Sequence, residues 1–340
     1  PYTSREMCRA LIREARALEI PLREDRVAVE LLTVDQDGAR RAAGAVLMAP
    51  DGTMETVLAE NVIFAVGGPG GLYRTSVYPE VHTGAIGLAL MAGARAQGLP
   101  ESQYGMASIG FRWNVSGTYM QVIPRFISTA ADGRSEEREF LQEYFDDPGT
   151  MHSMVFLKGY QWPFDSRKIA GGSSIVDILV YVETVLRGRR VFLDFRSNPA
   201  DFSFEALSDE AREYLEHSEA LLETPIERLR KMNPGAIALY ADHDIDITAE
   251  PLEIAVCAQH NNGGLAGNAW WESVNLPHCF PVGEVNGSHG VYRPGGSALN
   301  AGQVGSLRAA EFIAARYADR TLDAAAAAAR AVERTDALSA

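Results

Sequence analysis

The 340-residue chain lacks the features that define several large classes of protein. It has three cysteines, Cys8, Cys257 and Cys279, and none of them has C-x-x-C spacing. An odd number of cysteines is a poor basis for a disulfide framework and favours a reducing compartment, so we expect a cytoplasmic protein. No apolar run approaches the roughly 20 residues that a membrane-spanning helix needs, so direct membrane insertion is not expected.

Positive charge is also scarce. The chain has 31 Lys and Arg against 45 Asp and Glu, which gives a formal net charge of −14. A nucleic-acid partner would require a basic face to meet its phosphates, so none is expected. Hydrophobic residues make up 46% of the chain, enough to bury a full core in what its length suggests are two packed units.

Several fingerprints of catalysis are missing as well. No G-x-G-x-x-G occurs, because Tyr73 stands where the third glycine of the pattern from Gly68 belongs, so the dinucleotide fingerprint is incomplete. The P-loop, G-x-S-x-G and H-E-x-x-H patterns are absent too, which leaves nucleotide triphosphatases, serine hydrolases and zinc proteases without support. The acidic run at 242–246 is interpreted as a solvated face, and no metal is expected.

The chain does contain two glycine-rich segments, which flank a central segment that is rich in charged residues. Residues 27–60 predict a small antiparallel meander, and the apolar run at 61–66 predicts a parallel strand buried on both faces. The glycine-rich segments 61–98 and 258–305 bracket residues 113–255, which hold most of the charge runs. This pattern is typical of one α/β domain interrupted by an insertion. Helices are expected near 3–18, 84–97, 174–187, 205–231, 297–317 and 321–334.

The most informative stretch is residues 257–311. It contains His260-Asn-Asn-Gly-Gly, then Gly-Glu284, then His289-Gly-Val-Tyr-Arg293-Pro-Gly-Gly296 and a run of small residues. This order resembles the C-terminal signature of the fumarate reductase, succinate dehydrogenase and L-aspartate oxidase flavoproteins, in which H-x-x-G-G precedes G-E and H-G-x-x-R-x-G-G. The strand and glycines at 61–68 resemble the same family, so the resemblance extends over nearly the whole chain.

The resemblance implies the fold and its boundaries. It implies an α/β FAD-binding domain, Rossmann-like and of the glutathione reductase type, that is interrupted by an α+β capping domain. The expected FAD-binding domain comprises 1–112 and 256–320, the capping domain 113–255, and a helical tail 321–340. Because the phosphate-binding fingerprint is absent, the family's N-terminal βαβ unit is expected upstream of Pro1.

The resemblance also implies an FAD cofactor held by a defined set of residues. Gly295 and Gly296 carry no side chain just before a helix expected to begin near Ser297, whose free N–H groups and dipole would stabilise negative charge on a reduced flavin. In the family, the acid at the position of Glu284 holds hydroxyls of the flavin chain. The expected cofactor-binding residues are Gly67, Gly68, Glu284, Gly296, Ser297, Ala298 and Leu299.

His260 and Arg293 resemble the family's substrate-carboxylate ligands, and arginine offers a planar fork that matches an oxyanion. The family's proton-transferring arginine stands in an R-D pair before a helix of the cap, at a fixed distance ahead of a Glu. Counting back from Glu183 by that distance reaches Ser173, and Arg167 lies nearby but out of register. The expected catalytic residues are therefore His260, Arg293, Arg167 and Ser173, and a poor fumarate reductase is expected because serine is a weak acid.

The function implied is that of an FAD-dependent oxidoreductase. It would transfer hydride between flavin N5 and an activated carbon–carbon bond of a small acid or ketone, with the protein supplying an anion clamp and a proton donor. A small-molecule substrate such as a carboxylate and an electron-transfer partner are implied with it. A different class stays open at this point: a non-catalytic flavoprotein-like binding or assembly subunit, favoured by the missing fingerprint and the missing Arg-Asp pair.

Overall fold

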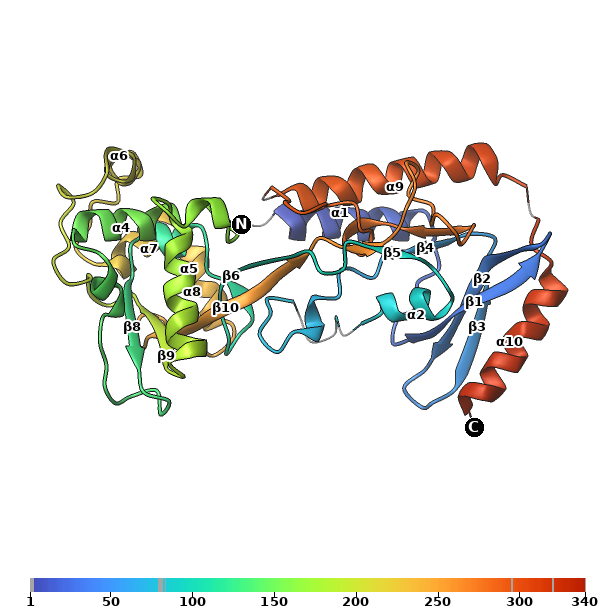
Figure 1. Ribbon diagram of the computed structural model, residues 1–340. Coiled ribbons are helices and arrows are strands. Elements are labelled where there is room, and N and C mark those ends of the chain that lie inside the picture. The colour runs from blue at the N-terminus through green and yellow to red at the C-terminus, as the bar shows by residue number, and fades with distance from the viewer. Residues whose placement is uncertain (1–2, 79–81, 83, 295, 320, 340) are drawn as a thin grey trace.

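The molecule consists of two lobes joined by a pair of long strands (Figure 1). The computed structural model describes residues 3–78, 82, 84–294, 296–319 and 321–339. The joining strands are β6 (Ser102–Ser108) and β10 (Leu252–Asn261), which pair antiparallel along their length. We call residues 109–251 the middle lobe and the residues outside 102–261 the outer lobe. The boundary expected at 255/256 falls inside β10, so the sheet of the middle lobe continues toward the outer lobe.

The elements of the outer lobe are the following: α1 (Thr3–Ala17), β1 (Val27–Gln36), β2 (Ala39–Met48), β3 (Met54–Leu58), β4 (Val62–Phe64), η1 (Gly70–Leu72), α2 (Ile86–Met91), β5 (Ala96–Gln97), β11 (Gly264–Leu265), β12 (Cys279–Pro281), η5 (Gly283–Val285), α9 (Ser297–Arg316) and α10 (Ala324–Ser339). Those of the middle lobe are β7 (Trp113–Asn114), α3 (Thr118–Gln121), β8 (Arg125–Thr129), η2 (Phe140–Tyr144), α4 (Pro148–Leu157), η3 (Ser166–Lys168), α5 (Ser174–Tyr181), η4 (Val182–Leu186), β9 (Arg190–Asp194), α6 (Asp209–His217), α7 (Pro225–Met232) and α8 (Pro234–Ala241).

The predicted meander is confirmed, because β1, β2 and β3 form a three-stranded antiparallel sheet. The alanine-rich tail forms α10, which lies across this sheet (Figure 1). Ala327 and Ala331 are buried there, since a small side chain lets a helix approach closely, and Arg334 Nε lies 2.6 Å from Glu30 Oε1 of β1. The tail is therefore packed on the outer lobe.

Gly44 is the tightest point of the meander. Its φ of +140° is a conformation that other residues rarely adopt, and a Cβ there would lie 2.0 Å from the carbonyl oxygen of Val57. We expect Gly44→Ala to lower the free energy of unfolding by about 2–3 kcal/mol in urea titrations. The control is Gly87→Ala in α2, where a Cβ meets nothing within 4 Å and φ is ordinary, so stability should hold or rise. Equal stability of the two variants would contradict the close contact.

The parallel strand predicted at 61–66 exists but is less buried than expected. β4 pairs parallel with β12, yet Ile63 is 55% exposed while its neighbour Phe64 is buried, so only one face of the strand is covered in the described structure. The helix expected over 84–97 is also shorter. It ends at Met91 because Gly93 takes a φ of +95° that turns the chain into β5.

The middle lobe surrounds a five-stranded sheet in the order β7-β6-β10-β9-β8, and helices α3 to α8 pack into one apolar core with it. The helix expected over 205–231 is two helices, α6 and α7. Pro225 begins α7 because proline suits the first helical position, and Thr224 and Glu227 form a reciprocal cap there. In the described parts of the chain, no helix is long and apolar enough to cross a bilayer.

Candidate functional site

His260 lies at the end of β10, where the strand leaves the sheet. A register shift between Ala258 and His260 turns its side chain toward the outer lobe, and the residue is 3% exposed. Its Nδ1 lies 2.9 Å from Oδ1 of Asn262, and its Nε2 lies 3.2 Å from Oε1 of Glu284. The imidazole is thus fixed between an amide and a carboxylate.

Glu284 stands in η5, the turn after β12, and connects two neighbours. One carboxylate oxygen faces His260, and the other accepts a hydrogen bond of 3.2 Å from the hydroxyl of Tyr78. Burial raises the pKa of Glu284, but His260, Tyr78 and Arg293 more than offset it, so the pKa lies below its usual value. Burial and the Glu284 charge raise the pKa of Tyr78. Near neutral pH, Glu284 is therefore an anion and Tyr78 a proton donor.

Arg293 is 5% exposed and is held by an exchange of hydrogen bonds with Gln103 of β6. Its Nε donates to Gln103 Oε1 at 3.1 Å, and Gln103 Nε2 donates to the Arg293 carbonyl at 2.8 Å. Its Nη1 donates to the carbonyl of Pro294 at 3.3 Å, and no partner of Nη2 is found among the described residues. Burial lowers the pKa of Arg293, but a guanidinium stays charged in proteins. The site thus contains one oriented cation with an unused donor.

His289 completes the cluster. Its ring meets that of His260 edge-on, with centroids 4.8 Å apart and an interplanar angle of 86°. Burial, with help from His260 and Arg293, lowers the pKa of His289 to about 4, so the ring is neutral at physiological pH. Both ring nitrogens are buried, and neither has a partner within the described chain. Because buried polar atoms are normally hydrogen-bonded, these nitrogens suit a bound ligand.

The start of α9 fits the expected cofactor. Gly296 precedes it with a φ of +80°, and no side chain caps the helix, since the Ser297 hydroxyl donates back to the carbonyl of Pro294 at 2.8 Å. The first-turn N–H groups, including those of Ala298 and Leu299, therefore face outward with the positive end of the dipole. η5 packs against α9, which places the Glu284 turn beside this helix. Gly295 lies outside the described residues.

Gly67 and Gly68 lie close to the rings of His82 and Tyr78, next to the cluster. Gly67 has a φ of +74°, and a Cβ on it would lie 3.2 Å from the ring of His82. A Cβ on Gly68 would lie 3.2 Å from the Tyr78 hydroxyl, the group that donates to Glu284. The absence of a side chain at Gly68 leaves room for the Tyr78 hydroxyl beside the carboxylate, and its absence at Gly67 leaves room for the ring of His82.

The two other expected catalytic residues lie in different surroundings. Arg167 has a side chain that is 70% exposed, pairs with Asp165 at 2.8 Å, and stacks over the ring of Tyr292 at 4.7 Å. It therefore reaches the neighbour of Arg293 from the middle lobe. Ser173 is fully buried at the start of α5, and its hydroxyl donates to Gln161 Oε1 at 3.1 Å. The contacts of Ser173 thus lie inside the middle lobe.

Tyr78 and Gln103 belong to the site but are not identified by the sequence. Both contact their partners across long stretches of chain: Tyr78 is 206 residues from Glu284, and Gln103 is 190 residues from Arg293. The only local signal at Gln103 is its place on a strand two residues before a glycine, which says nothing about its partner.

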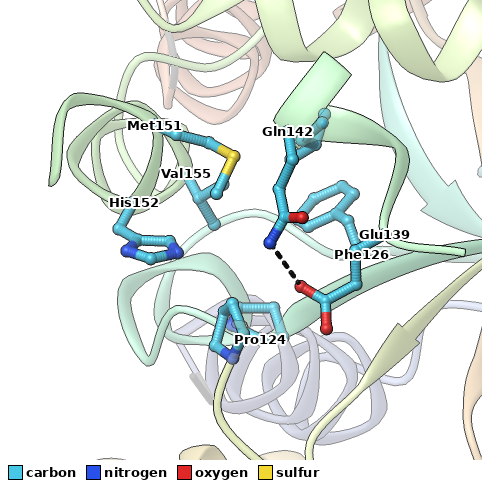
Figure 2. Close-up of a pocket in the computed structure, with 9 residues that line it drawn as sticks. Pro124, Phe126, Glu139, Gln142, Met151, His152 and Val155 are labelled. Carbon is cyan, nitrogen blue, oxygen red and sulfur yellow. Dashed lines mark hydrogen bonds between the residues drawn. The ribbon is translucent and has the colours of Figure 1, made fainter. Parts of the chain in front are cut away.

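A cavity in the middle lobe is a separate feature (Figure 2). It lies between β8, η2 and α4, where Gln142 donates to Glu139 at 3.4 Å and the ring of His152 points inward. Burial lowers the pKa of His152 to about 4, and both of its nitrogens are buried without partners in the described chain. The cavity encloses about 10 Å³, room for one water molecule, so it cannot hold a substrate.

Comparison with known proteins gives the following matches. The model of a family described as "FAD binding domain" matches residues 1–299. L-aspartate oxidase of Streptomyces coelicolor is 26% identical over 332 residues, which cover 95% of this chain and 48% of that protein. L-aspartate oxidase of Vibrio cholerae is 24% identical over 282 residues, which cover 80% of this chain and 43% of that protein.

Solved structures give the same fold. A quinol-fumarate reductase with menaquinol molecules matches with a TM-score of 0.61 at 22% identity, over 95% of this chain and 52% of that chain. An adenylylsulfate reductase from Archaeoglobus fulgidus matches with a TM-score of 0.52 at 18% identity, over 90% and 49%. The predicted fold class is thereby confirmed. The chain spans about half the length of the Streptomyces L-aspartate oxidase and of the quinol-fumarate reductase that it matches, 48% and 52%.

Proposed function

The chain belongs to the FAD binding domain family of flavoprotein oxidoreductases, and from that premise we propose that it acts on an activated carbon–carbon bond of a small acid or ketone. The observation that carries the proposal is a buried cluster beside α9. His260 Nε2 lies 3.2 Å from Glu284, and Gln103, which pairs with His260 across β6 and β10, holds Arg293 at 3.1 Å. A buried arginine with an unused N–H suits an oxyanion. The proposed substrate is therefore an anion or a polarised carbonyl compound.

The residues of the outer lobe would hold the cofactor. Glu284 would accept hydrogen bonds from its hydroxyls, and the N–H groups of Ala298 and Leu299, which have no acceptor among the described residues, would stabilise negative charge on it. When bound, FAD supplies a two-electron carrier that accepts or gives up hydride at N5. Tyr78 packs beside Gly68 and keeps the Glu284 carboxylate in place through its hydrogen bond.

The residues around the substrate have separate roles. Arg293 binds the oxyanion, and His260, oriented by Asn262 at Nδ1, donates to the same group through Nε2, which has no hydrogen-bond partner in the described chain. Arg167 is the proposed source of the proton, because it extends from the middle lobe to Tyr292 beside Arg293. Ser173 is less suited, since its buried hydroxyl is already bound to Gln161. An electron-transfer partner is proposed to exchange electrons with the cofactor between turnovers.

The test is anaerobic reoxidation of the reduced flavin in the full-length, FAD-loaded protein. Reduced protein is mixed with crotonate, fumarate or a cyclic enone, and the flavin absorbance band is followed. We expect at least one of these acceptors to restore the oxidised spectrum within seconds to minutes. If none reacts, and no saturated counterpart reduces the oxidised flavin, the enzymatic proposal fails and a binding or assembly subunit is the better description.

A further inference from the structure

A second group of polar atoms lies on the same face of β6 as Gln103. Along this strand Gln103 and Gly105 are buried while Tyr104 between them is 38% exposed, so the two buried residues share one face. Gln103 orients Arg293 through its 3.1 Å hydrogen bond. Gly105 lies about 7 Å further along the strand, the rise of two residues. That spacing equals the length of a short carboxylic acid.

Trp162 covers Gly105. It belongs to residues 158–168 of the middle lobe, which we call the strap, and the strap is fixed to β6 where Phe164 N donates to the Tyr104 carbonyl at 2.7 Å. A Cβ on Gly105 would lie 2.7 Å from the indole Nε1 of Trp162, closer than real Cβ contacts. Only glycine at this position leaves room for the indole N–H above the strand.

Two atoms beside Gly105 lack hydrogen-bond partners within the described chain. Trp162 Nε1 is a buried donor without an acceptor, and Gln259 Oε1 is a buried acceptor without a donor. Gln259 is 5% exposed, its Nε2 donates to the Met106 carbonyl at 3.3 Å, and its Cγ would lie 3.4 Å from a Cβ on Gly105. Both side chains therefore lie beside Gly105, on the face of β6 that Gln103 shares, and buried polar atoms in this state are rare in proteins.

We propose that Trp162 Nε1 and Gln259 Oε1 form a subsite for a hydroxyl group of the substrate. A hydroxyl oxygen accepts from the indole N–H while its own O–H donates to the amide oxygen, so one group satisfies both atoms. The inference rests on the proposed function, because Arg293 fixes the other end of the molecule. The substrate class is a short unsaturated carboxylic acid with a hydroxyl group at the end opposite its carboxylate.

A second carboxylate fits this subsite poorly. It can only accept hydrogen bonds, so it would face the Gln259 oxygen without a donor between them. Of the three cations of the strap, Lys158 is paired with Asp177 at 2.5 Å and Arg167 with Asp165 at 2.8 Å, and the charge of the third, Lys168, also acts on Asp165. A dicarboxylate would thus be desolvated at this end without a compensating charge.

The strap must move to admit the hydroxyl group. Both polar atoms are sealed from solvent in the present arrangement, in which the strap is held by Phe164 and by Arg167 stacked on Tyr292. Lifting the strap opens the face of β6, and closing it over the substrate gives Trp162 an acceptor. The same closure carries Arg167 to the site, so binding of the hydroxyl and placement of the proposed proton donor are coupled.

The test compares three probes by calorimetry on the full-length, oxidised, FAD-loaded protein: crotonate, 4-hydroxycrotonate and fumarate. We expect 4-hydroxycrotonate to bind about tenfold more tightly than crotonate, the effect of two hydrogen bonds, and more tightly than fumarate. Trp162→Phe, which keeps the ring and removes the N–H, and Gln259→Met should each reduce this advantage while crotonate binding holds. Trp270→Phe on the surface of the outer lobe, where Trp270 is 40% exposed, is the control and should change neither affinity.

The outcomes separate this subsite from the function on which it rests. Equal affinities for crotonate and 4-hydroxycrotonate, or tighter binding of fumarate, overturn the hydroxyl subsite. If Arg293→Lys still weakens all three probes in that case, the proposed function stands. If Arg293→Lys leaves all three affinities unchanged, the anion site itself is wrong and the proposed function falls with it.

Discussion

Replacing Arg293 by lysine is expected to weaken binding of a carboxylate substrate by about thirtyfold, or about 2 kcal/mol, with little change in the flavin spectrum. Arg293 has two tasks at once: its Nε and Nη1 donate to Gln103 and to the Pro294 carbonyl at 3.1 and 3.3 Å, and its Nη2 is left to bind an oxyanion. Lysine has one ammonium group and cannot do both. The effect should appear mainly in KM, because the cation remains but its geometry is lost.

The control is Arg316→Lys in the last turn of α9, where the side chain lies on the surface. That variant should match the parent protein in KM and in flavin content. Gln103→Leu separates orientation from charge: it keeps Arg293 but removes its anchor, so KM should rise by a smaller factor. If Arg293→Lys leaves KM unchanged while the substrate still turns over, the oxyanion is bound elsewhere.

The outer lobe could be predicted well from the sequence because its signals are local. The spacing of His260, Glu284 and Arg293 is carried by fewer than fifty consecutive residues, and it indicates one site without knowledge of any contact. The meander follows from runs of β-branched and apolar residues between two Asp-Gly turn signals. Turn chemistry is harder to predict: the helix expected to continue to residue 97 ends at Met91, since Gly93 at a φ of +95° outweighs the apolar periodicity around it.

The contacts that complete the site could not be predicted, because they join distant segments. Trp162 reaches Gly105 only because the strap folds back onto β6. In the sequence, a tryptophan and a glycine separated by more than fifty residues carry no pairing signal. Residue type also predicts the wrong environment for some charged side chains, because Lys and Asp are nearly always exposed in proteins. Lys158 and Asp177 are 1% and 2% exposed.

That buried pair gives the largest expected effect on stability. Lys158 Nζ lies 2.5 Å from Asp177 Oδ2 and donates to the Gln161 carbonyl at 3.2 Å. Burial raises the pKa of Asp177 to about 6, and the Lys158 charge acts in the opposite direction. Lys158→Met leaves an uncompensated carboxylate in the core. We expect it to lower the free energy of unfolding by about 3–5 kcal/mol at pH 8, measured by urea titration.

The pH dependence of the stability loss shows whether the uncompensated charge of Asp177 causes it. A carboxyl whose folded-state pKa is raised stabilises the fold when protonated, and that contribution is lost as pH rises through the folded-state pKa. Without Lys158, the pKa of Asp177 rises above about 6, so at pH 5 the carboxyl is neutral and the loss of stability should be smaller than at pH 8.

Adding Asp177→Leu to Lys158→Met should restore most of the stability, because no charge then remains to be compensated. The control is Lys231→Met, which breaks an exposed pair with Glu219 at the same 2.5 Å separation and should change little at either pH. An equal loss at pH 5 and pH 8 for Lys158→Met would mean that lost packing, and not the stranded charge, destabilises the protein.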